Sequence, residues 1–371
     1  MIGSFVIFLI IGMPFILFGA PSISGLSGTT GDGNTLTITG SDFFAHPDSE
    51  GNQKPTLFDD FEDNNETPST LGKMTAYNSD TTDCISIATS DPAEGTYYAT
   101  SDMTECFNFV EGGFHLTSSD GVSLPINGYL TVSIYRYANT SDSDRSENWK
   151  WFRPAKDSDF SNQNFYIGES PDDDPNITRE PSGDSTYLGG SYTELGSGWI
   201  QEAYIMQRES TATGTDAELH IIQDGDVVFS TATGFQMNES GAGAGTFDSI
   251  RLGDDLSNDR ESTTGSLNYD LIYVDTMTPV LVMLISSATY ADATEAIPQP
   301  YSAMSTTEIT ITQKGVTELG GDADNIWVGV CKFEECATPV QLSSAGGGGG
   351  SSGDDLNMQG DFTIQGDLTI Q

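Results

Sequence analysis

Hydrophobic and polar residues alternate over short stretches along most of this chain, and turn-forming residues separate the stretches. Residues 36–39 (LTIT) alternate with a period of two, and residues 129–137 (YLTVSIYRY) do so over a longer span. A period of two predicts a β-strand with one buried face, and no long stretch has the 3.6-residue period of an amphipathic helix. The pattern therefore predicts an all-β protein.

Two further patterns support this fold class. Residues 280–285 (VLVMLI) are apolar throughout, which is typical of a strand buried on both faces. Asp224 and Gly225 lie between two alternating runs. The pair Asp-Gly favours a type I′ turn because both central residues of that turn have positive φ, so we predict a tight hairpin here.

The start of the chain after residue 20 resembles an IPT/TIG domain, which is an immunoglobulin-like module. Residues 21–23 (PSI) and 35–43 (TLTITGSDF) match the family's Pro-x-Ile opening and its T-x-T-I-x-G-x-x-F strand and corner, and residues 303–312 (AMSTTEITIT) resemble a later strand of the family. A strand pair at the N-terminus cannot bury its apolar face alone. We therefore predict one discontinuous immunoglobulin-like sandwich made of residues 21–56 and 276–342.

The intervening residues 57–275 resemble a concanavalin A-like or laminin-G-like jelly roll. Residues 57–63 (LFDDFED), the Asp-Gly hairpin and residues 269–275 (YDLIYVD) carry this resemblance. It implies a jelly-roll β-sandwich inserted into a surface loop of the first domain, an arrangement that costs little when the ends of the insert lie close together. The competing interpretation is two unrelated fragments flanking the jelly roll, and it leaves strand edges unpaired.

The two ends of the chain differ from the rest. Residues 1–20 are almost wholly apolar and carry no charge, which predicts a signal peptide or a membrane anchor; the length and the exit at Gly19 and Ala20 favour the signal peptide. Either one implies an extracellular, cell-surface or virion-surface location. Residues 343–356 are a Gly/Ser-rich linker by composition. Residues 357–371 contain two copies of a six-residue repeat, which resembles a short β tail of a viral fibre and implies a homo-oligomer.

The charge balance narrows the choice of partners. The 371 residues include 13 Lys and Arg against 55 Asp and Glu, a formal net charge of −42. A basic footprint for nucleic acid is therefore absent. The acidic residues favour a solubilising surface, and the sharper hypothesis is structural calcium, the one cofactor we consider. Its candidate ligands, none with EF-hand spacing, are Asp59, Asp60, Asp254 and Asp255.

The four cysteines fit an oxidising compartment. Cys331 and Cys336 bracket a four-residue loop, which would place them opposite each other on a hairpin where a disulfide can form. Cys84 and Cys106 make the other plausible pair, although four cysteines allow three connectivities. Zinc is the weaker interpretation because the three histidines, His46, His115 and His220, are scattered along the chain.

No catalytic constellation stands out. Glycoside hydrolases of the concanavalin A-like fold place paired carboxylates at alternating positions of one strand. Glu202 and Glu218 lie on predicted strands without such a partner, and Tyr135 and Arg136 are adjacent and therefore point to opposite faces. We assign no catalytic residue and expect no enzymatic activity.

Aromatic residues are the main indication of binding, because sugar rings stack their apolar faces on Trp and Tyr. The alternative for each aromatic is a place in the sandwich core. We expect an exported or particle-surface recognition module that binds a glycan or another cell-surface ligand, with a structural fibre component and a glycan-degrading hydrolase or lyase as alternatives. The candidate ligand-binding residues are Trp149, Trp151, Tyr166 and Tyr187.

Overall fold

The computed structural model describes most of the chain as β-strands joined by turns, with short 3₁₀ helices η3 (Tyr290–Asp292), η4 (Ala323–Asn325) and η5 (Leu342–Gly346). The all-β prediction is confirmed. Among the described residues, no helix is long and apolar enough to cross a membrane. The described residues are 19–62, 75–76, 85–90, 92–102, 114–118, 121–140, 150–155, 165–169, 175–179, 184–187, 198–211, 214–231, 235, 237, 246–252 and 265–346.

Two sheets combine strands from both ends of the described chain. One has the order β1-β2-β21-β20, and the other has the order β19-β18-β22-β23, with β24 also paired with β22. The bounds are β1 (Ser22–Gly28), β2 (Thr35–Ser41), β18 (Val280–Ile285), β19 (Ala296–Pro298), β20 (Tyr301–Met304), β21 (Glu308–Thr312), β22 (Trp327–Lys332), β23 (Glu335–Cys336) and β24 (Val340–Gln341).

The pairing of β2 with β21 joins the two sequence segments that flank the long insert. It is antiparallel and runs from Thr35 opposite Thr312 to Thr39 opposite Glu308. The predicted pairing across the insert is therefore present. β18 is buried along its whole length, as its unbroken apolar sequence predicts.

The insert forms two larger antiparallel sheets. One contains β12-β11-β10-β9-β16-β7-β4, and the other contains β15-β14-β13-β8-β17-β6-β5 with β3 also paired with β17. We call them the seven-stranded and the eight-stranded sheet. The bounds are β3 (Leu57–Asp59), β4 (Thr75–Ala76), β5 (Ile85–Ala88), β6 (Tyr98–Asp102), β7 (Phe114–Thr117), β8 (Tyr129–Thr140), β9 (Lys150–Ala155), β10 (Phe165–Glu169), β11 (Pro175–Arg179), β12 (Asp184–Tyr187), β13 (Ile200–Gln207), β14 (Glu218–Gln223), β15 (Asp226–Ser230), β16 (Ser249–Leu252) and β17 (Gly265–Asp275).

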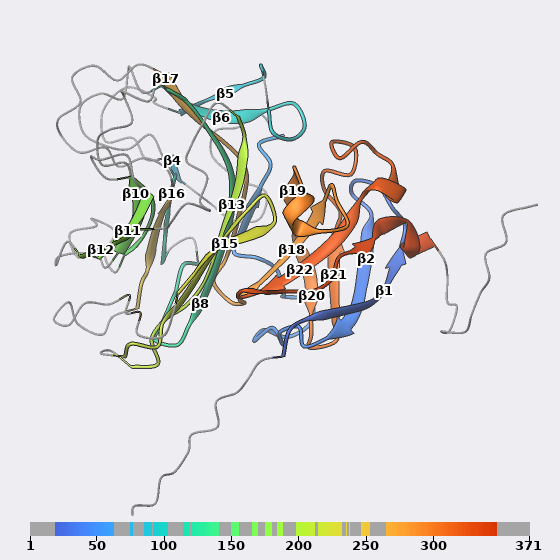
Figure 1. Cartoon of the computed structure of the whole chain (residues 1–371), viewed down its shortest axis with the longest axis horizontal. Helices are drawn as coiled ribbons and strands as arrows, with labels where there is room; N and C mark the ends of the chain where they lie inside the picture. Colours follow the sequence, from blue (N-terminus) through green and yellow to red (C-terminus); the bar gives the residue numbers. More distant parts are fainter. Residues whose placement is uncertain are drawn as a thin grey trace, which may run out of the picture.

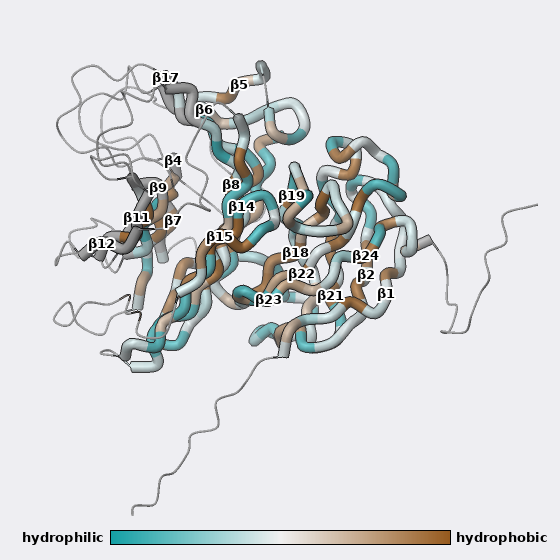
Figure 2. The backbone as a smooth tube through the Cα atoms, viewed as in Figure 1, coloured by the Kyte–Doolittle hydropathy of each residue, from teal (hydrophilic) through white to brown (hydrophobic). Residues whose placement is uncertain are grey.

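The inner faces of these two sheets share one apolar core. Val132 of β8 and Leu219 of β14 meet Phe152 of β9 and Ile250 of β16 in it. Alternate residues of these four strands therefore point inward, as period-two patterning requires. In Figure 2 the tube of the eight-stranded sheet around β8 and β14 carries brown segments between paler ones.

The outer face of the eight-stranded sheet packs against the first pair of sheets. Tyr135, Ile205 and Tyr273 from the insert share a second apolar cluster with Leu281 and Ile297. The Ala296 N–H also donates a hydrogen bond to Tyr135 Oη, at 2.9 Å. In Figure 1 the eight-stranded sheet accordingly lies between the seven-stranded sheet and the first pair of sheets, which we call the sandwich. One outer face of the insert is thus an intramolecular interface.

Two predicted turns have the expected geometry. Asp224 and Gly225 have φ values of 46° and 86°, as a type I′ turn requires, and Gln223 pairs with Asp226. Cys331 and Cys336 form a disulfide. The partners of the other predicted disulfide, Cys84 and Cys106, lie outside the described residues.

At the C-terminal end, η5 continues through Gly346 and buries Leu342 and Ala345 in the second cluster. The first residues of the predicted linker are therefore packed structure, because Ala345 is buried in the core beside Leu342.

Candidate functional site

Three of the four predicted ligand-binding positions lie in the seven-stranded sheet: Trp151 on β9, Tyr166 on β10 and Tyr187 on β12. Trp151 and Tyr166 each adjoin a core residue, Phe152 and Ile167 respectively. Strand alternation therefore places position 166 on the outer face, whereas position 151 lies at a register shift between β9 and β10 that interrupts the alternation.

Tyr187 belongs to the same face. It pairs with Asn176, whose neighbour Ile177 is in the core. The sheet thus brings positions 166 and 187 onto one surface. The fourth, Trp149, lies outside the described residues.

Two arginines share this outer face. Arg251 of β16 pairs across the strands with Arg153 of β9, and their neighbours Leu252 and Phe152 are core residues. Arg251 is also opposite His115 of β7. The strand register therefore places His115, Arg251 and Arg153 at paired positions on the three adjacent strands β7, β16 and β9. The chain has only 13 Lys and Arg, so an arginine pair on one sheet face is a notable concentration.

These two arginines are not among the binding residues predicted from the sequence. The available signal was an Arg at a polar position of a short apolar strand, as in the segments 150–153 (KWFR) and 249–252 (SIRL). Their proximity depends on the β9–β16 pairing, which no local pattern predicts. Arg153 is 1% and Arg251 is 4% exposed, and both have interaction partners.

This outer face, which we call the Arg153–Arg251 face, combines residue types that suit an oxygen-rich ligand. A guanidinium presents five donors in a planar fork that matches carboxylates and hydroxyl pairs, and such bonds are stronger where water is excluded. Tyrosine supplies a surface on which sugar rings stack. A carbohydrate is the ligand class that uses both.

The carboxylate of Glu202 belongs to the interior instead. Arg136 Nη2 lies 2.5 Å from Glu202 Oε2, and Gln223 Nε2 donates to the same oxygen at 2.8 Å. The Tyr204 hydroxyl donates to the other oxygen, and its ring stacks on Phe152 at 4.5 Å. Since Glu202 is 0% exposed, its carboxylate and the three side chains that contact it form a buried polar network inside the insert.

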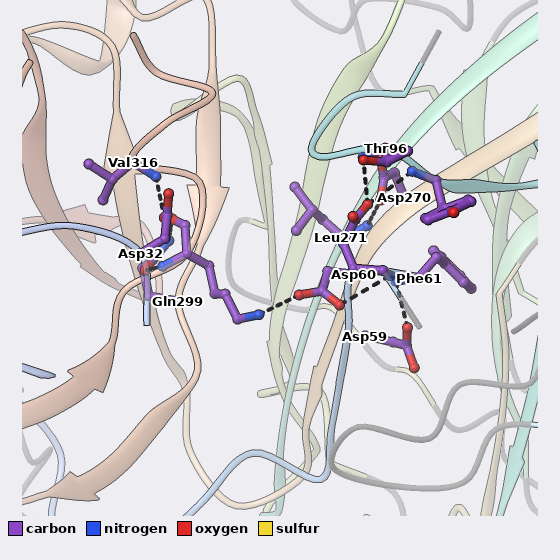
Figure 3. A network of polar contacts seen from close by, with 12 residues as sticks. Asp32, Asp59, Asp60, Phe61, Thr96, Asp270, Leu271, Gln299 and Val316 are labelled. Carbon is purple, nitrogen blue, oxygen red and sulfur yellow. Dashed lines mark hydrogen bonds and ion pairs between the residues drawn. The ribbon is translucent and has the colours of Figure 1, made fainter. Parts of the chain in front are cut away.

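The described candidates for calcium ligands, Asp59 and Asp60, lie where the insert meets the first pair of sheets (Figure 3). Asp59 Oδ1 accepts a hydrogen bond from the Phe61 N–H at 2.7 Å. Asp60 Oδ2 accepts one from Lys314 Nζ at 2.5 Å. Both carboxylates are thus engaged by protein donors. Calcium binding stays a prediction, and the other two candidates, Asp254 and Asp255, lie outside the described residues.

A buried carboxyl group, Glu94, lies beside this junction. Burial raises its pKa to about 8, and the nearby charges of Glu318, Asp60 and Glu62 act in the same direction. Asp270 holds the loop by accepting hydrogen bonds from the N–H groups of Ala93 and Glu94, both at 3.0 Å. The junction therefore holds a carboxyl that keeps its proton at neutral pH.

Comparison with known proteins gives weak structural likeness. No protein-family model matches the sequence, and no curated protein matches it either. The endo-β-1,4-glucuronan lyase of the fungus Trichoderma reesei is similar with a TM-score of 0.39 and 10% identity, over 55% of this chain and 90% of the lyase.

Two toxin domains are similar to the same degree. The binding domain of Paraclostridial Mosquitocidal Protein 1 has a TM-score of 0.41 and 8% identity, over 67% of this chain and 63% of that domain. The receptor-binding domain of botulinum neurotoxin type G has a TM-score of 0.38 and 6% identity, over 76% of this chain and 74% of that domain. All three scores are below 0.5, and we therefore infer the function from this chain's own residues.

Proposed function

We propose that this protein is an exported, non-catalytic recognition module that binds a glycan on the Arg153–Arg251 face. One observation carries the proposal: the strand register places positions 166 and 187 on the face of the sheet that also carries the buried pair Arg153 and Arg251. Aromatic surfaces and forked donors together are what a sugar ring and its oxygen atoms require.

The packing of the insert supports the choice of this face. The outer face of the eight-stranded sheet is occupied by the sandwich, where Tyr135 and Ile205 are buried in the shared cluster. Of the two outer faces of the jelly roll, the seven-stranded one is therefore the one that does not form this interface.

Two features support export. Residues 1–20 have the composition of a signal peptide or anchor. The Cys331–Cys336 disulfide belongs to the kind of bond that persists in extracellular or periplasmic compartments. An extracellular or particle-surface glycan is the partner that such a location implies.

The proposal is tested with a glycan array probed by the full chain, in calcium and in chelator. We expect selective binding that falls about tenfold or more in Tyr166→Ala, a loss of about 1.4 kcal/mol or more. Tyr97→Ala is the matched control because this partly buried tyrosine lies beside β6, in the other sheet. Its binding should equal that of the wild type.

Two results would overturn the proposal. Equal binding by all variants, each with a normal melting temperature, would place the glycan site elsewhere. No binding to any glycan in either buffer would favour the alternative, a purely structural component of a fibre or surface layer.

A second candidate function is supported by the row His115, Arg251 and Arg153. Glycan lyases cleave a uronate-containing chain by β-elimination, in which a base removes a proton and cationic groups neutralise the uronate carboxylate. The histidine of this row could serve as the base, and the two arginines are the cationic groups. The captured sugars are therefore also assayed for unsaturated products and for new reducing ends. Either product would establish an enzyme in place of a binding module.

A further inference from the structure

A histidine and two glutamates from distant parts of the chain meet where β14 faces the β22–β23 hairpin. Glu218 and His220 belong to β14, and Glu334 lies in the turn of the hairpin. His220 Nε2 is 3.2 Å from Glu334 Oε2 and 3.8 Å from Glu218 Oε2. One ligand atom from each residue lies within 4.8 Å of the other two.

The imidazole of His220 is buried and oriented. Its side chain is 3% exposed, and Nδ1 lies 2.9 Å from Ser230 Oγ on the paired strand β15. Within the described part of the chain, Nε2 has no hydrogen-bond partner. When Nδ1–H donates to the serine hydroxyl, the Nε2 lone pair faces two carboxylates. The Nε2 lone pair and the two carboxylate oxygens repel one another, so a positive charge between them would stabilise the arrangement.

The hairpin that carries Glu334 is firmly placed. The Cys331–Cys336 disulfide closes it, and the ladder continues to Lys332 opposite Glu335. The Phe333 ring packs edge-on against the His220 ring, with centroids 5.9 Å apart. The carboxylate of Glu334 is therefore held beside Nε2 of the imidazole.

The cluster is accessible to solvent on the side of its two glutamates. The side chains of Glu218 and Glu334 are 48% and 50% exposed, while the histidine is sealed beneath them. An ion could thus enter from water, keep one or two water ligands and still contact a buried nitrogen.

We propose that Glu218, His220 and Glu334 bind one divalent cation of the zinc class. One imidazole nitrogen and two carboxylate oxygens, completed by water, form a ligand set that zinc accepts in four-coordinate geometry. The nitrogen ligand separates this site from the calcium expectation, because calcium prefers oxygen ligands. The ion would join β14 of the insert to the hairpin of the sandwich and so fasten the two modules together.

The experiment uses the full chain, stripped with chelator and titrated with zinc by calorimetry and thermal melting. We expect one tight equivalent and, at about a hundredfold excess over the dissociation constant, a rise in melting temperature of about 3 to 5 °C. Calcium at the same concentration should give no comparable rise.

Two variants test the ligands. Glu334→Gln is expected to weaken zinc binding about tenfold or more and to cancel the thermal shift, and His220→Gln to abolish both. The matched control is Glu335→Gln, one residue further along the same hairpin, which should behave as the wild type.

Two outcomes would overturn the site. Zinc binding that is equal in Glu334→Gln and Glu335→Gln would show adsorption elsewhere on this acidic chain. No heat and no thermal shift in the wild type, together with lower stability of Glu334→Gln in chelator, would show that the cluster is only an ion pair with a protonated histidine.

Discussion

Although the chain has a net charge of −42, some of its carboxyl groups are buried and hydrogen-bonded to the protein. Asp275 is 0% exposed, and it accepts hydrogen bonds from Met277 N at 2.8 Å, Thr278 Oγ1 at 2.6 Å and Tyr301 Oη at 2.9 Å. Burial raises its pKa to about 6, and these donors limit the rise. The last residue of β17 thereby fixes the path of the chain from the insert into the sandwich.

Glu94 predicts a specific pH dependence. Its pKa is raised to about 8 by burial and neighbouring charges, so the native state holds a proton that the unfolded chain has lost above about pH 4.5. The free energy of unfolding should therefore fall as pH rises from about 4.5 to 8. In urea titrations, we expect the wild type to lose about 1 to 3 kcal/mol more than Glu94→Gln across this window.

Glu50→Gln is the control for this prediction because Glu50 is an exposed acid of a surface loop. It should keep the wild-type slope of stability against pH. Parallel profiles for the wild type and Glu94→Gln would contradict the role assigned to Glu94.

The buried pair of Arg136 and Glu202 predicts non-additive stability. Glu202→Leu removes the carboxylate from a guanidinium that is 2% exposed, and we expect a loss of about 3 to 5 kcal/mol. The double variant Arg136→Met with Glu202→Leu should recover only part of this loss, because it removes the unpaired charge while Tyr204 and Gln223 still lose the carboxylate as an acceptor. A double-mutant cycle in denaturant measures the coupling, and purely additive losses would contradict it.

At the scale of elements, the corner after β2 explains one motif of the sequence. A Cβ on Gly40 would lie 1.8 Å from the carbonyl oxygen of Ser22 and 2.6 Å from Cζ of Phe43. The glycine and the phenylalanine of the T-x-T-I-x-G-x-x-F phrase therefore pack against each other. A side chain at position 40 cannot be accommodated without moving β1.

This contact predicts that Gly40→Ala lowers the free energy of unfolding by about 2 kcal/mol or more. Gly25→Ala, in the paired strand β1, is the matched control because no atom lies within 4 Å of the added Cβ. Thermal melting of both variants tests this prediction, and Gly40→Ala should have the lower melting temperature. Equal melting temperatures would contradict the steric account.

At the scale of the whole molecule, one apolar cluster spans the insert and the sandwich. Tyr135, Ile222 and Tyr273 of the eight-stranded sheet share it with Leu284 and Val330. Unfolding the sandwich would expose this sheet face to water, and at about 25 cal/mol per Å² such exposure is costly. The two modules should therefore depend on each other for stability.

We expect a single cooperative transition when the full chain is unfolded in a calorimeter. The excised segment 57–275 should melt at a lower temperature and aggregate, since it exposes a large apolar patch. Two separate transitions, or an isolated segment as stable and soluble as the full chain, would contradict this dependence.

Local pattern determined much of the fold. Period-two runs marked β2, β8 and β14, the unbroken apolar run marked β18, and Asp224 with Gly225 marked the hairpin, because these features depend on neighbours within a few residues. Cys331 and Cys336 were paired correctly for the same reason, since a short hairpin sets their distance.

Only the tertiary structure decided which distant residues meet. The Arg153–Arg251 pair and the group of Glu218, His220 and Glu334 form through strand pairing and module packing, and the separation of their members along the chain hides them from any local pattern. The sequence by itself determined strands, turns and an acidic surface. The packing of one sheet on another determined which side chains share a face, and therefore where binding chemistry can occur.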